Sequence, residues 1–306
     1  MTEPRAYDAI VLGAGAAGLW CAAAAGQRGK RVLLLEHAGE PGKKILISGG
    51  GRCNFTNLHT VPERFLSQNP HFAKSALSRF TPEDFLALVE RHGIAWHEKT
   101  LGQLFCDGSA RQIVAMLVAE CEAGGVELNC GDAIRGVEHG DGQFRVSFGA
   151  HEASAPVLVI ATGGPSIPKM GATGFAYDLA RRFGLKVIEP RPALVPLTLG
   201  GEDVLFRELS GVSAPVIARC GKAAFAEAAL FTHRGLSGPA ILQVAPARAL
   251  FDHRALHGGE RGIAVRLERL GEKRGNVGES HRFSIRGKGQ SAWPAAQPLA
   301  HAHWKL

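Results

Sequence analysis

The fold is decided by residues 7–36, which begin Tyr7-Asp-Ala-Ile-Val-Leu-Gly-Ala-Gly-Ala-Ala-Gly-Leu-Trp-Cys-Ala22. The apolar run over 9–12 predicts one buried parallel strand, and the alanine-rich run over 20–25 predicts a helix. A second apolar run over 32–35 predicts another buried strand, which ends at Glu36. Strand, glycine-rich turn, helix and strand therefore follow one another in the order of a dinucleotide-binding β-α-β unit.

The glycines of this unit have the spacing G-x-G-x-x-G, and each has a physical task. Gly13 allows the tight turn, Gly15 lets the backbone approach a pyrophosphate, and Gly18 lets the helix pack on the strand. Glu36 stands at the distance at which an acid accepts hydrogen bonds from a ribose hydroxyl. A glycine-rich turn alone would be weak evidence, but the flanking elements and the acid favour a nucleotide site over an ordinary turn. The predicted contacts are Gly13, Ala14, Gly15, Ala16, Ala17, Gly18, Glu36 and His37.

A second glycine-rich stretch covers residues 42–57, Gly42-Lys-Lys-Ile-Leu-Ile-Ser-Gly-Gly-Gly-Arg-Cys-Asn-Phe-Thr-Asn57. Three consecutive glycines do not suit the interior of a helix or strand, so we expect a loop that approaches a ligand closely. Its cationic side chains would offset phosphate charge, and its serine and asparagines would donate hydrogen bonds. The residues predicted to contact the ligand are Lys43, Lys44, Ser48, Gly49, Gly50, Gly51, Arg52 and Asn54.

Three further patterns extend the α/β assignment. Thr81-Pro-Glu-Asp84 and Ser109-Ala-Arg-Gln112 both predict helix starts, each with a capping residue. The alternating stretch over 143–148 predicts a half-exposed strand of a small antiparallel sheet. An apolar strand over 156–160 runs into Ala161, Thr162 and Gly163, whose small side chains would let the chain pass close over a nucleotide.

Composition limits the classes of function. The chain has 306 residues, 45% of them hydrophobic, and no segment with the roughly 18 uninterrupted apolar residues of a membrane span. Without a signal-peptide pattern, we expect a cytoplasmic protein with no membrane partner. The six cysteines form no C-x-x-C pair, so we expect free thiols and no metal site.

The net charge of +7 is unevenly distributed along the chain. Residues 251–306 contain ten Lys/Arg and five Asp/Glu, or +5, which leaves +2 on residues 1–250. The body of the chain also shows no evident basic patch with aromatics, so we expect no nucleic-acid partner. We expect a small-molecule substrate instead, and the sequence leaves the oligomeric state open.

Several motifs together resemble the bacterial NAD(P)/FAD-dependent oxidoreductases of the aminoacetone-oxidase family, also described as BaiN/YhiN-like flavoproteins. The stretches that carry the resemblance are Gly13–Gly18, Lys43–Asn57, Ala161–Gly164 with Pro168, Gly171–Gly174, Pro192–Pro196 and Phe231–Gln243. The resemblance covers about residues 5–245 and implies FAD as the bound nucleotide. It also implies that the Gly49–Asn54 loop lies by the pyrophosphate and the flavin ring, and that the backbone of Ile134 packs by the adenine.

The implied architecture is a doubly wound, Rossmann-like FAD-binding domain with an inserted, mainly-β second domain. We assign residues 1–190 to the FAD-binding domain and 191–250 to a partial inserted domain. From about residue 246 the chain becomes rich in Arg, Gly, His and Pro, and the family's C-terminal part is not apparent. We therefore expect residues 251–306 to be an atypical basic tail, disordered, in a truncated or frameshifted gene product.

The resulting hypothesis is an FAD-dependent oxidoreductase, with NAD(P)H as a transient electron donor at the flavin. Only one dinucleotide fingerprint is visible, so no second built NAD(P)H domain is expected. No catalytic acid or base is assigned. The alternatives are a catalytically inactive family member, an NAD-dependent Rossmann dehydrogenase without flavin, and a flavin-dependent RNA-modifying enzyme, against which the charge of the body argues.

Overall fold

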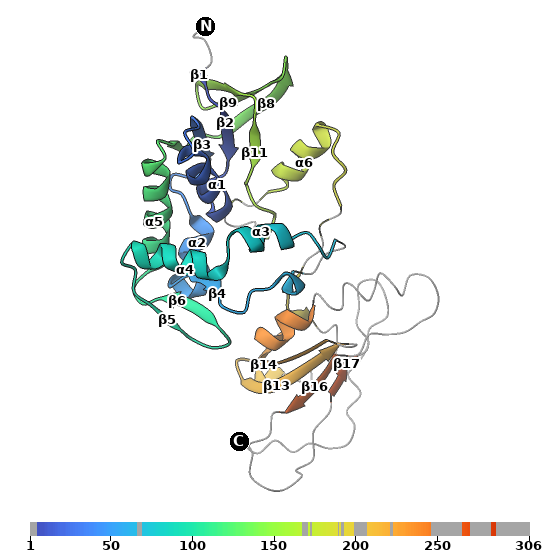
Figure 1. Cartoon of the computed structure of the whole chain (residues 1–306). Helices are drawn as coiled ribbons and strands as arrows, with labels where there is room; N and C mark the ends of the chain where they lie inside the picture. The colour runs from blue at the N-terminus through green and yellow to red at the C-terminus, as the bar shows by residue number, and fades with distance from the viewer. Residues whose placement is uncertain are drawn as a thin grey trace. The chain divides into compact units, whose positions relative to one another are not determined.

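A computed structural model gives the structure of the protein (Figure 1). It describes residues 5–65, 69–166, 171, 173–188, 190, 193–198, 207–220, 223–245, 265–269 and 283–285. The chain divides into two compact units, residues 1–188 and residues 189–306.

The helices of the first unit are α1 (Ala16–Gly26), α2 (Lys43–Ile47), α3 (Lys74–Arg79), α4 (Pro82–Arg91), α5 (Ala110–Ala123) and α6 (Phe175–Arg182). Short 3-10 turns cover Ser48–Gly51 and Pro62–Arg64. The strands are β1 (Arg5–Ala6), β2 (Ala9–Leu12), β3 (Val32–Glu36), β4 (Asn54–Asn57), β5 (Trp96–Glu98), β6 (Gln103–Cys106), β7 (Glu127–Cys130), β8 (Ile134–Gly140), β9 (Gln143–Phe148), β10 (His151–Ala155) and β11 (Leu158–Ile160).

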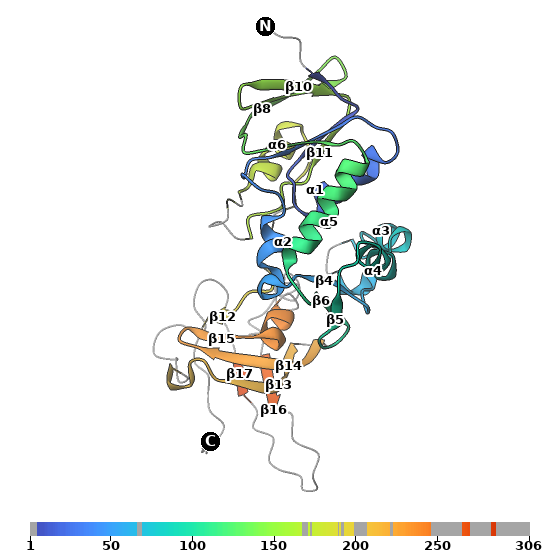
Figure 2. The same ribbon diagram turned by 90° about the vertical axis from the view of Figure 1, so that its left-hand side faces the viewer.

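A parallel sheet of order β11-β2-β3-β7 forms the centre of this unit. Side chains alternate between its two faces, as the pleat of a strand requires. Val11 and Leu34 point into a core shared with α1 and α5, which lie side by side (Figure 2). Ile10 and Leu33 point into the opposite core, which is closed by α6 and by the mixed sheet β1-β10-β9-β8, in which only β1 and β10 pair in parallel. The expected doubly wound α/β domain is confirmed.

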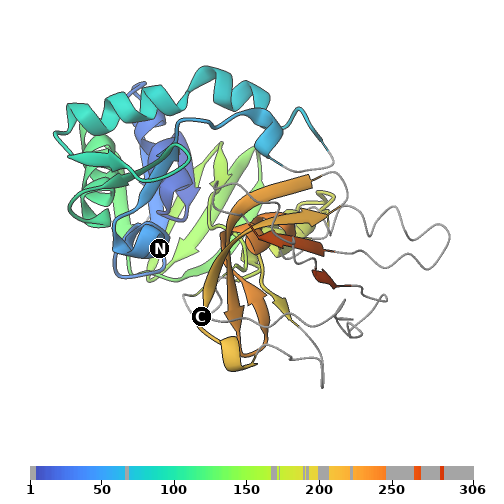
Figure 3. The ribbon, with the colours of Figure 1, turned by 90° about the horizontal axis from the view of Figure 1, so that it is seen from below.

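The crossover from β3 to β7 is long, since it spans residues 37–126 although the two strands are hydrogen-bonded neighbours. It contains α2 to α5 and a separate three-stranded sheet of order β4-β6-β5. Helices α3 and α4 follow each other along one side of the unit (Figure 3). The predicted helix starts are confirmed, because Thr81 with Asp84 and Ser109 with Gln112 form capping boxes at α4 and α5.

The expectation that residues 42–57 form one loop is wrong at both ends. Lys43–Ile47 forms the short helix α2, which turns Ile45 into the core beside α5. Asn54–Asn57 forms β4, whose backbone groups pair with β6. Burial of Ile45 and satisfaction of backbone hydrogen bonds thus outweigh the glycines' preference for a loop. The glycine stretch itself is a turn, with positive φ at Gly49, Gly50 and Gly51.

The second unit is a sheet of order β12-β15-β14-β13-β16-β17. Its strands are β12 (Leu197–Thr198), β13 (Ser213–Cys220), β14 (Ala223–Thr232), β15 (Gly235–Ser237), β16 (Val265–Arg269) and β17 (Phe283–Ile285). Residues 239–245 are helical, and Ile241 and Val244 pack into one core with Val216 and Ala218 of the sheet. Strands β16 and β17 belong to the stretch expected to be a tail. The rest of residues 246–306 lies outside the described residues, so the predicted tail and the 190/191 boundary stay predictions.

Within the part of the chain that the structure describes, no helix is both long enough and apolar enough to cross a membrane.

The contact between α1 and the glycine turn gives a stability prediction. A Cβ at Gly18 would lie 1.8 Å from the carbonyl oxygen of Gly13, so Gly18→Ala forces the helix away from the sheet. We expect a loss of about 1–3 kcal/mol in the free energy of unfolding, the usual cost of overpacking, measured by urea titration. Gly140→Ala is the control, because its Cβ would meet nothing within 4 Å. Equal losses in the two variants would contradict the assignment.

Candidate functional site

A cavity of about 450 Å³ opens at the carboxyl ends of β2, β3 and β11. This is the edge at which open α/β sheets bind their ligands. The cavity lies entirely within the first unit. Its lining residues are Gly13, Ala14, Gly15, Ala16, Ala17, Trp20, Leu35, Glu36, His37, Gly42, Lys43, Lys44, Ile45, Ser48, Cys53, Asn54, Phe55, Phe85, Ile113, Leu117, Ile134, Ala161, Thr162, Gly163 and Gly171.

The glycine loop presents the N-terminus of α1 to this cavity. Gly13 has φ +99°, and its N–H donates to the carbonyl of Leu35 at 2.7 Å, which holds the loop against the end of β3. Gly15 is the N-cap of α1, with no side chain capping the helix and no acid in the first turn. A Cβ at Gly15 would meet nothing within 4 Å, so the space in front of the helix is open. The unpaired N–H groups there suit a phosphate.

Glu36, at the end of β3, anchors the glycine loop through its carboxylate. Its Oε2 accepts the N–H of Ala14 at 2.8 Å, and its Oε1 accepts the N–H of Ala38 at 3.0 Å. His37 Nδ1 lies 3.1 Å from the same Oε1, and the Glu36 side chain is only 12% exposed. A carboxylate has about four acceptor positions, so Glu36 keeps capacity for a ligand hydroxyl while it holds the loop.

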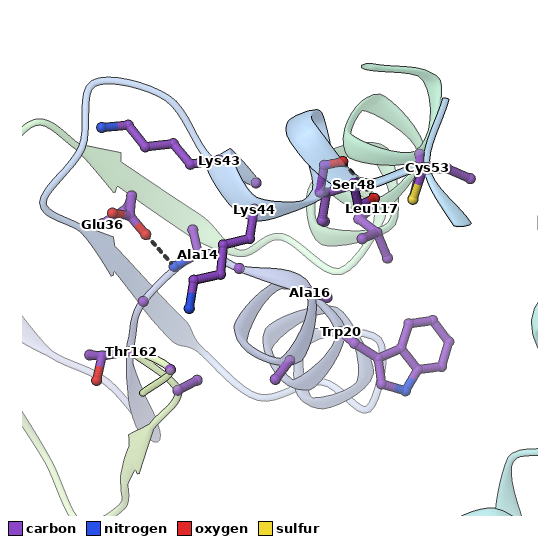
Figure 4. A pocket seen from close by; sticks show the side chains of 18 of the residues that line it. Ala14, Ala16, Trp20, Glu36, Lys43, Lys44, Ser48, Cys53, Leu117 and Thr162 are labelled. Atoms are coloured by element: carbon purple, nitrogen blue, oxygen red, sulfur yellow. Dashed lines mark hydrogen bonds between the residues drawn. The ribbon is translucent and has the colours of Figure 1, made fainter. Parts of the chain in front are cut away.

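Two lysines at the start of α2 bring positive charge to the cavity. Lys44 Nζ donates to Ser166 Oγ at 2.8 Å, which ties α2 to the chain that follows β11. In Figure 4, Lys44 lies between Glu36 and Ala16. Lys43 is exposed and forms no ion pair within the described ranges. Both amines are therefore available to offset phosphate charge.

The other end of the cavity is apolar. Trp20, Phe55 and Phe85 line it together with Ile113 and Leu117 of α5. The ring centroids of Phe55 and Phe85 lie 6.1 Å apart, and Phe80 bridges the rings of Phe85 and Trp20, with centroid distances of 6.4 and 4.5 Å. Figure 4 shows Trp20 and Cys53 on the side away from Glu36 and Thr162. A cavity with one polar end and one flat apolar end fits a dinucleotide whose second half is an aromatic ring system.

Cys53 lies at this apolar end and has an unusual backbone, with φ +51°. Burial raises the pKa of its thiol, and a hydrogen bond with Ser48 offsets part of that shift. Cys106, on the neighbouring β6, is also buried, and its pKa is raised to about 11, mainly by burial. Both thiols are therefore neutral at physiological pH, and none of the six cysteines is in a disulfide.

The structure brings most of the predicted contact residues into one cavity. Five of them do not line it: Gly18, Gly49, Gly50, Gly51 and Arg52. Gly18 serves the predicted packing of helix on strand, since it abuts Gly13. Gly49 is held beside Phe105, which a Cβ would approach to 2.7 Å. The residues' contacts with a cofactor stay a prediction.

Sequence reasoning missed the cavity residues that look like ordinary core. Trp20 follows the glycine motif but was assigned only to the helix, and Phe55 and Phe85 lie in separate elements of the crossover. The missed residues are Trp20, Leu35, Gly42, Ile45, Phe55, Phe85, Ile113, Leu117 and Gly171. Helical periodicity marks Ile113 and Leu117 as buried but cannot tell a cavity wall from a packed core.

Comparison with models of protein families assigns the chain to a family. A family described as "HI0933-like protein Rossmann domain" matches residues 7–236, which include the whole cavity. The chain belongs to the HI0933-like Rossmann family. The resemblance drawn from the sequence motifs is thereby confirmed.

Three curated relatives show the range of this family. The chain is 54% identical over 242 residues to a ribosomal RNA dihydrouridine synthase of Escherichia coli, and 49% identical over 241 residues to one of Haemophilus influenzae. These alignments cover 78% and 77% of the chain, and it spans about 60% of the length of either relative. It is also 28% identical over 243 residues to a 3-dehydro-bile acid delta(4,6)-reductase of Clostridium scindens, covering 76% of the chain and 58% of that relative.

These HI0933-like relatives overturn the expected partners. Two of them are named for action on ribosomal RNA, so the expectation of a small-molecule substrate and no nucleic acid is wrong. The expectation of no nucleic-acid partner rests on the net charge of residues 1–250, which is only +2. Nucleic-acid binding depends on local clusters of positive charge on the surface. A net charge summed over 250 residues does not reveal such clusters.

The role of Glu36 can be tested with FAD as the probe. Glu36→Ala removes the acceptor of two backbone N–H groups, and with it the acceptor that we predict for a ribose hydroxyl. Because hydrogen bonds to a charged group are worth about 1.5–3 kcal/mol, we expect FAD to bind about 10- to 100-fold more weakly. Equilibrium dialysis with absorbance detection measures this.

The matched control for this substitution is Glu40→Ala. Glu40 is half exposed and only 3.5 Å from Arg111, a surface pair worth about 0–1 kcal/mol. We expect FAD affinity close to that of the unmodified protein. Equal affinity in Glu36→Ala and Glu40→Ala would remove Glu36 from the site.

The thiol of Cys53 gives a pH prediction. Because burial raises its pKa, the reactive thiolate forms only at a higher pH than in an unstructured peptide. We expect alkylation of Cys53 by iodoacetamide to be slow at pH 8 and to rise steeply above it, as followed by mass spectrometry. Unfolding in guanidinium should abolish the difference. Fast alkylation of folded Cys53 at pH 7 would contradict the buried placement.

Proposed function

We propose that this chain is an FAD-dependent reductase that converts uridine of ribosomal RNA to dihydrouridine, with NAD(P)H as electron donor. The observation that carries the proposal is 54% identity over 242 residues to a protein named for that reaction. Since the chain spans about 60% of that relative's length, the activity of the whole relative is carried over as a proposal only. The same proposal includes a cytoplasmic location, where ribosomal RNA is found.

The residues of the cavity fit FAD in three parts. The N-terminus of α1, with Lys43 and Lys44, would hold the pyrophosphate. Glu36 would accept the hydroxyls of the adenosine ribose, and Ile134 would border the adenine. The apolar end with Trp20 would hold the flavin ring system.

The reaction is a two-electron reduction of a carbon–carbon double bond. Held by the residues named above, FAD would supply the hydride-transfer chemistry between NAD(P)H and the uracil double bond. The balance is one NAD(P)H, one proton and one uridine consumed, with NAD(P)⁺ and dihydrouridine formed. The bile-acid relative is also named as a reductase, and its name likewise places the reaction at ring double bonds.

The protein's own contribution is to hold the reactants and exclude water. The packed rings of Phe55 and Phe85 close the apolar end, where a hydride must be protected from solvent. The neutral thiol of Cys53 adds no charge beside the ring. An NAD-dependent dehydrogenase without flavin has less use for this apolar end, because FAD carries the larger ring system.

The test begins with the visible absorption spectrum of the purified protein after FAD loading and desalting. The loaded protein is then incubated with NADPH and ribosomal RNA from cells that lack the modification, and nucleosides are analysed by mass spectrometry. We expect dihydrouridine, recognised by the mass of two added hydrogens, and none with protein that has not been loaded with FAD. A flavin-loaded protein that is reduced by NADPH yet forms no dihydrouridine would overturn the proposal.

A further inference from the structure

The segment between β4 and α4 carries features that the cavity does not use. Its positive side chains are Arg64, Lys74 and Arg79, and its acid is Glu63, so residues 59–79 alone have a net charge of +2 besides two histidines. Residues 1–250 together also have a net charge of +2. The three cations are exposed, and none forms an ion pair with another described residue. Residues 59–79 are therefore a local concentration of positive charge within residues 1–250.

Two exposed aromatic residues lie in the same segment of the sequence as these cations. Phe72 is 74% exposed, more than any other large hydrophobic residue described, and Phe65 is 47% exposed. An exposed phenylalanine costs free energy in water, and the backbone around this one is hydrogen-bonded. The N–H of Phe72 donates to the carbonyl of Asn69 at 3.1 Å, and the neighbouring Ala73 is buried. The fold thus holds the ring of Phe72 in solvent.

We propose that Arg64, Phe65, Phe72, Lys74 and Arg79 form a contact surface for single-stranded RNA. An exposed ring flanked by cations is the arrangement on which bases stack while phosphates are neutralised. A membrane surface would call for a continuous apolar face, whereas α3 buries no residue and presents Lys, Ser and Arg. The inference deepens the proposed function and rests on it.

The surface is physically joined to the apolar end of the cavity. Phe80 is the residue that ends α3, directly after Arg79, and its ring centroid lies 4.5 Å from that of Trp20, which lines the cavity. A strand held on Phe72 and Arg79 would therefore approach the cavity at its apolar end.

The experiment uses the full chain loaded with FAD and a fluorescein-labelled single-stranded RNA, with binding followed by fluorescence polarisation. Loss of one base-stacking contact weakens binding by roughly 5- to 150-fold, so we expect at least a fivefold loss for Phe72→Ala. Phe72→Trp should restore the affinity, since it keeps a flat ring. Leu185→Ala is the control, because Leu185 is 61% exposed and lies apart from the surface in sequence.

A second variant tests the charges. Lys74→Gln combined with Arg79→Gln should lower the slope of log affinity against log salt by about 1.4, since each phosphate contact to a single strand contributes about 0.7. Retention of FAD serves as the check that every variant is folded. Both predictions concern binding alone and do not require turnover.

The outcomes separate this surface from the proposed function. Dihydrouridine formation with unchanged RNA affinity in Phe72→Ala overturns the surface and leaves the proposed function standing. RNA binding that depends on Phe72, without any dihydrouridine, supports the surface and overturns the function. Failure of the unmodified chain to bind RNA overturns the surface, as does binding only to vesicles of phosphatidylglycerol and phosphatidylcholine.

Discussion

The close contact between the backbone of Gly13 and Gly18 is the constraint on which the candidate site depends. A Cβ at Gly18 would stand 1.8 Å from the Gly13 carbonyl oxygen, so only glycine lets α1 start directly against the turn that leaves β2. This contact sets where the helix N-terminus faces. The hydrogen bonds of Glu36 then lock the turn to the end of β3. The helix N-terminus that suits a phosphate is therefore positioned by backbone geometry and local packing.

Around this rigid polar end, the apolar end is assembled from parts that come from elsewhere in the chain. Trp20 is carried by α1, Phe55 by β4 and Phe85 by α4. Their rings are held by one another and by Phe80 rather than by the parallel sheet. The polar end of the cavity is thus stabilised by backbone hydrogen bonds, and the apolar end by the packing of aromatic rings.

The polar half could be predicted from sequence because its spacing is set by local geometry. Gly13, Gly15 and Gly18 are close in the chain, and Glu36 follows one helix and one strand later. The apolar half could not, since Phe55 and Phe85 meet only after the chain has folded. Residues 42–57 show the same limit, because the burial of Ile45 against α5 decides that α2 forms. The net charge likewise concealed the exposed Phe72 and its neighbouring cations.

The crossover between β3 and β7 has an evolutionary consequence. The two strands pair directly, and everything from residue 37 to 126 is inserted between them without interrupting the parallel sheet. That insertion supplies Cys53, Phe55 and Phe85, whereas the glycine turn and Glu36 precede it. Changes in the crossover beyond α2 can therefore alter the apolar end of the cavity while the glycine turn, Glu36 and the two lysines of α2 stay as they are. A scaffold of this kind can acquire new substrates through substitutions in a single crossover connection.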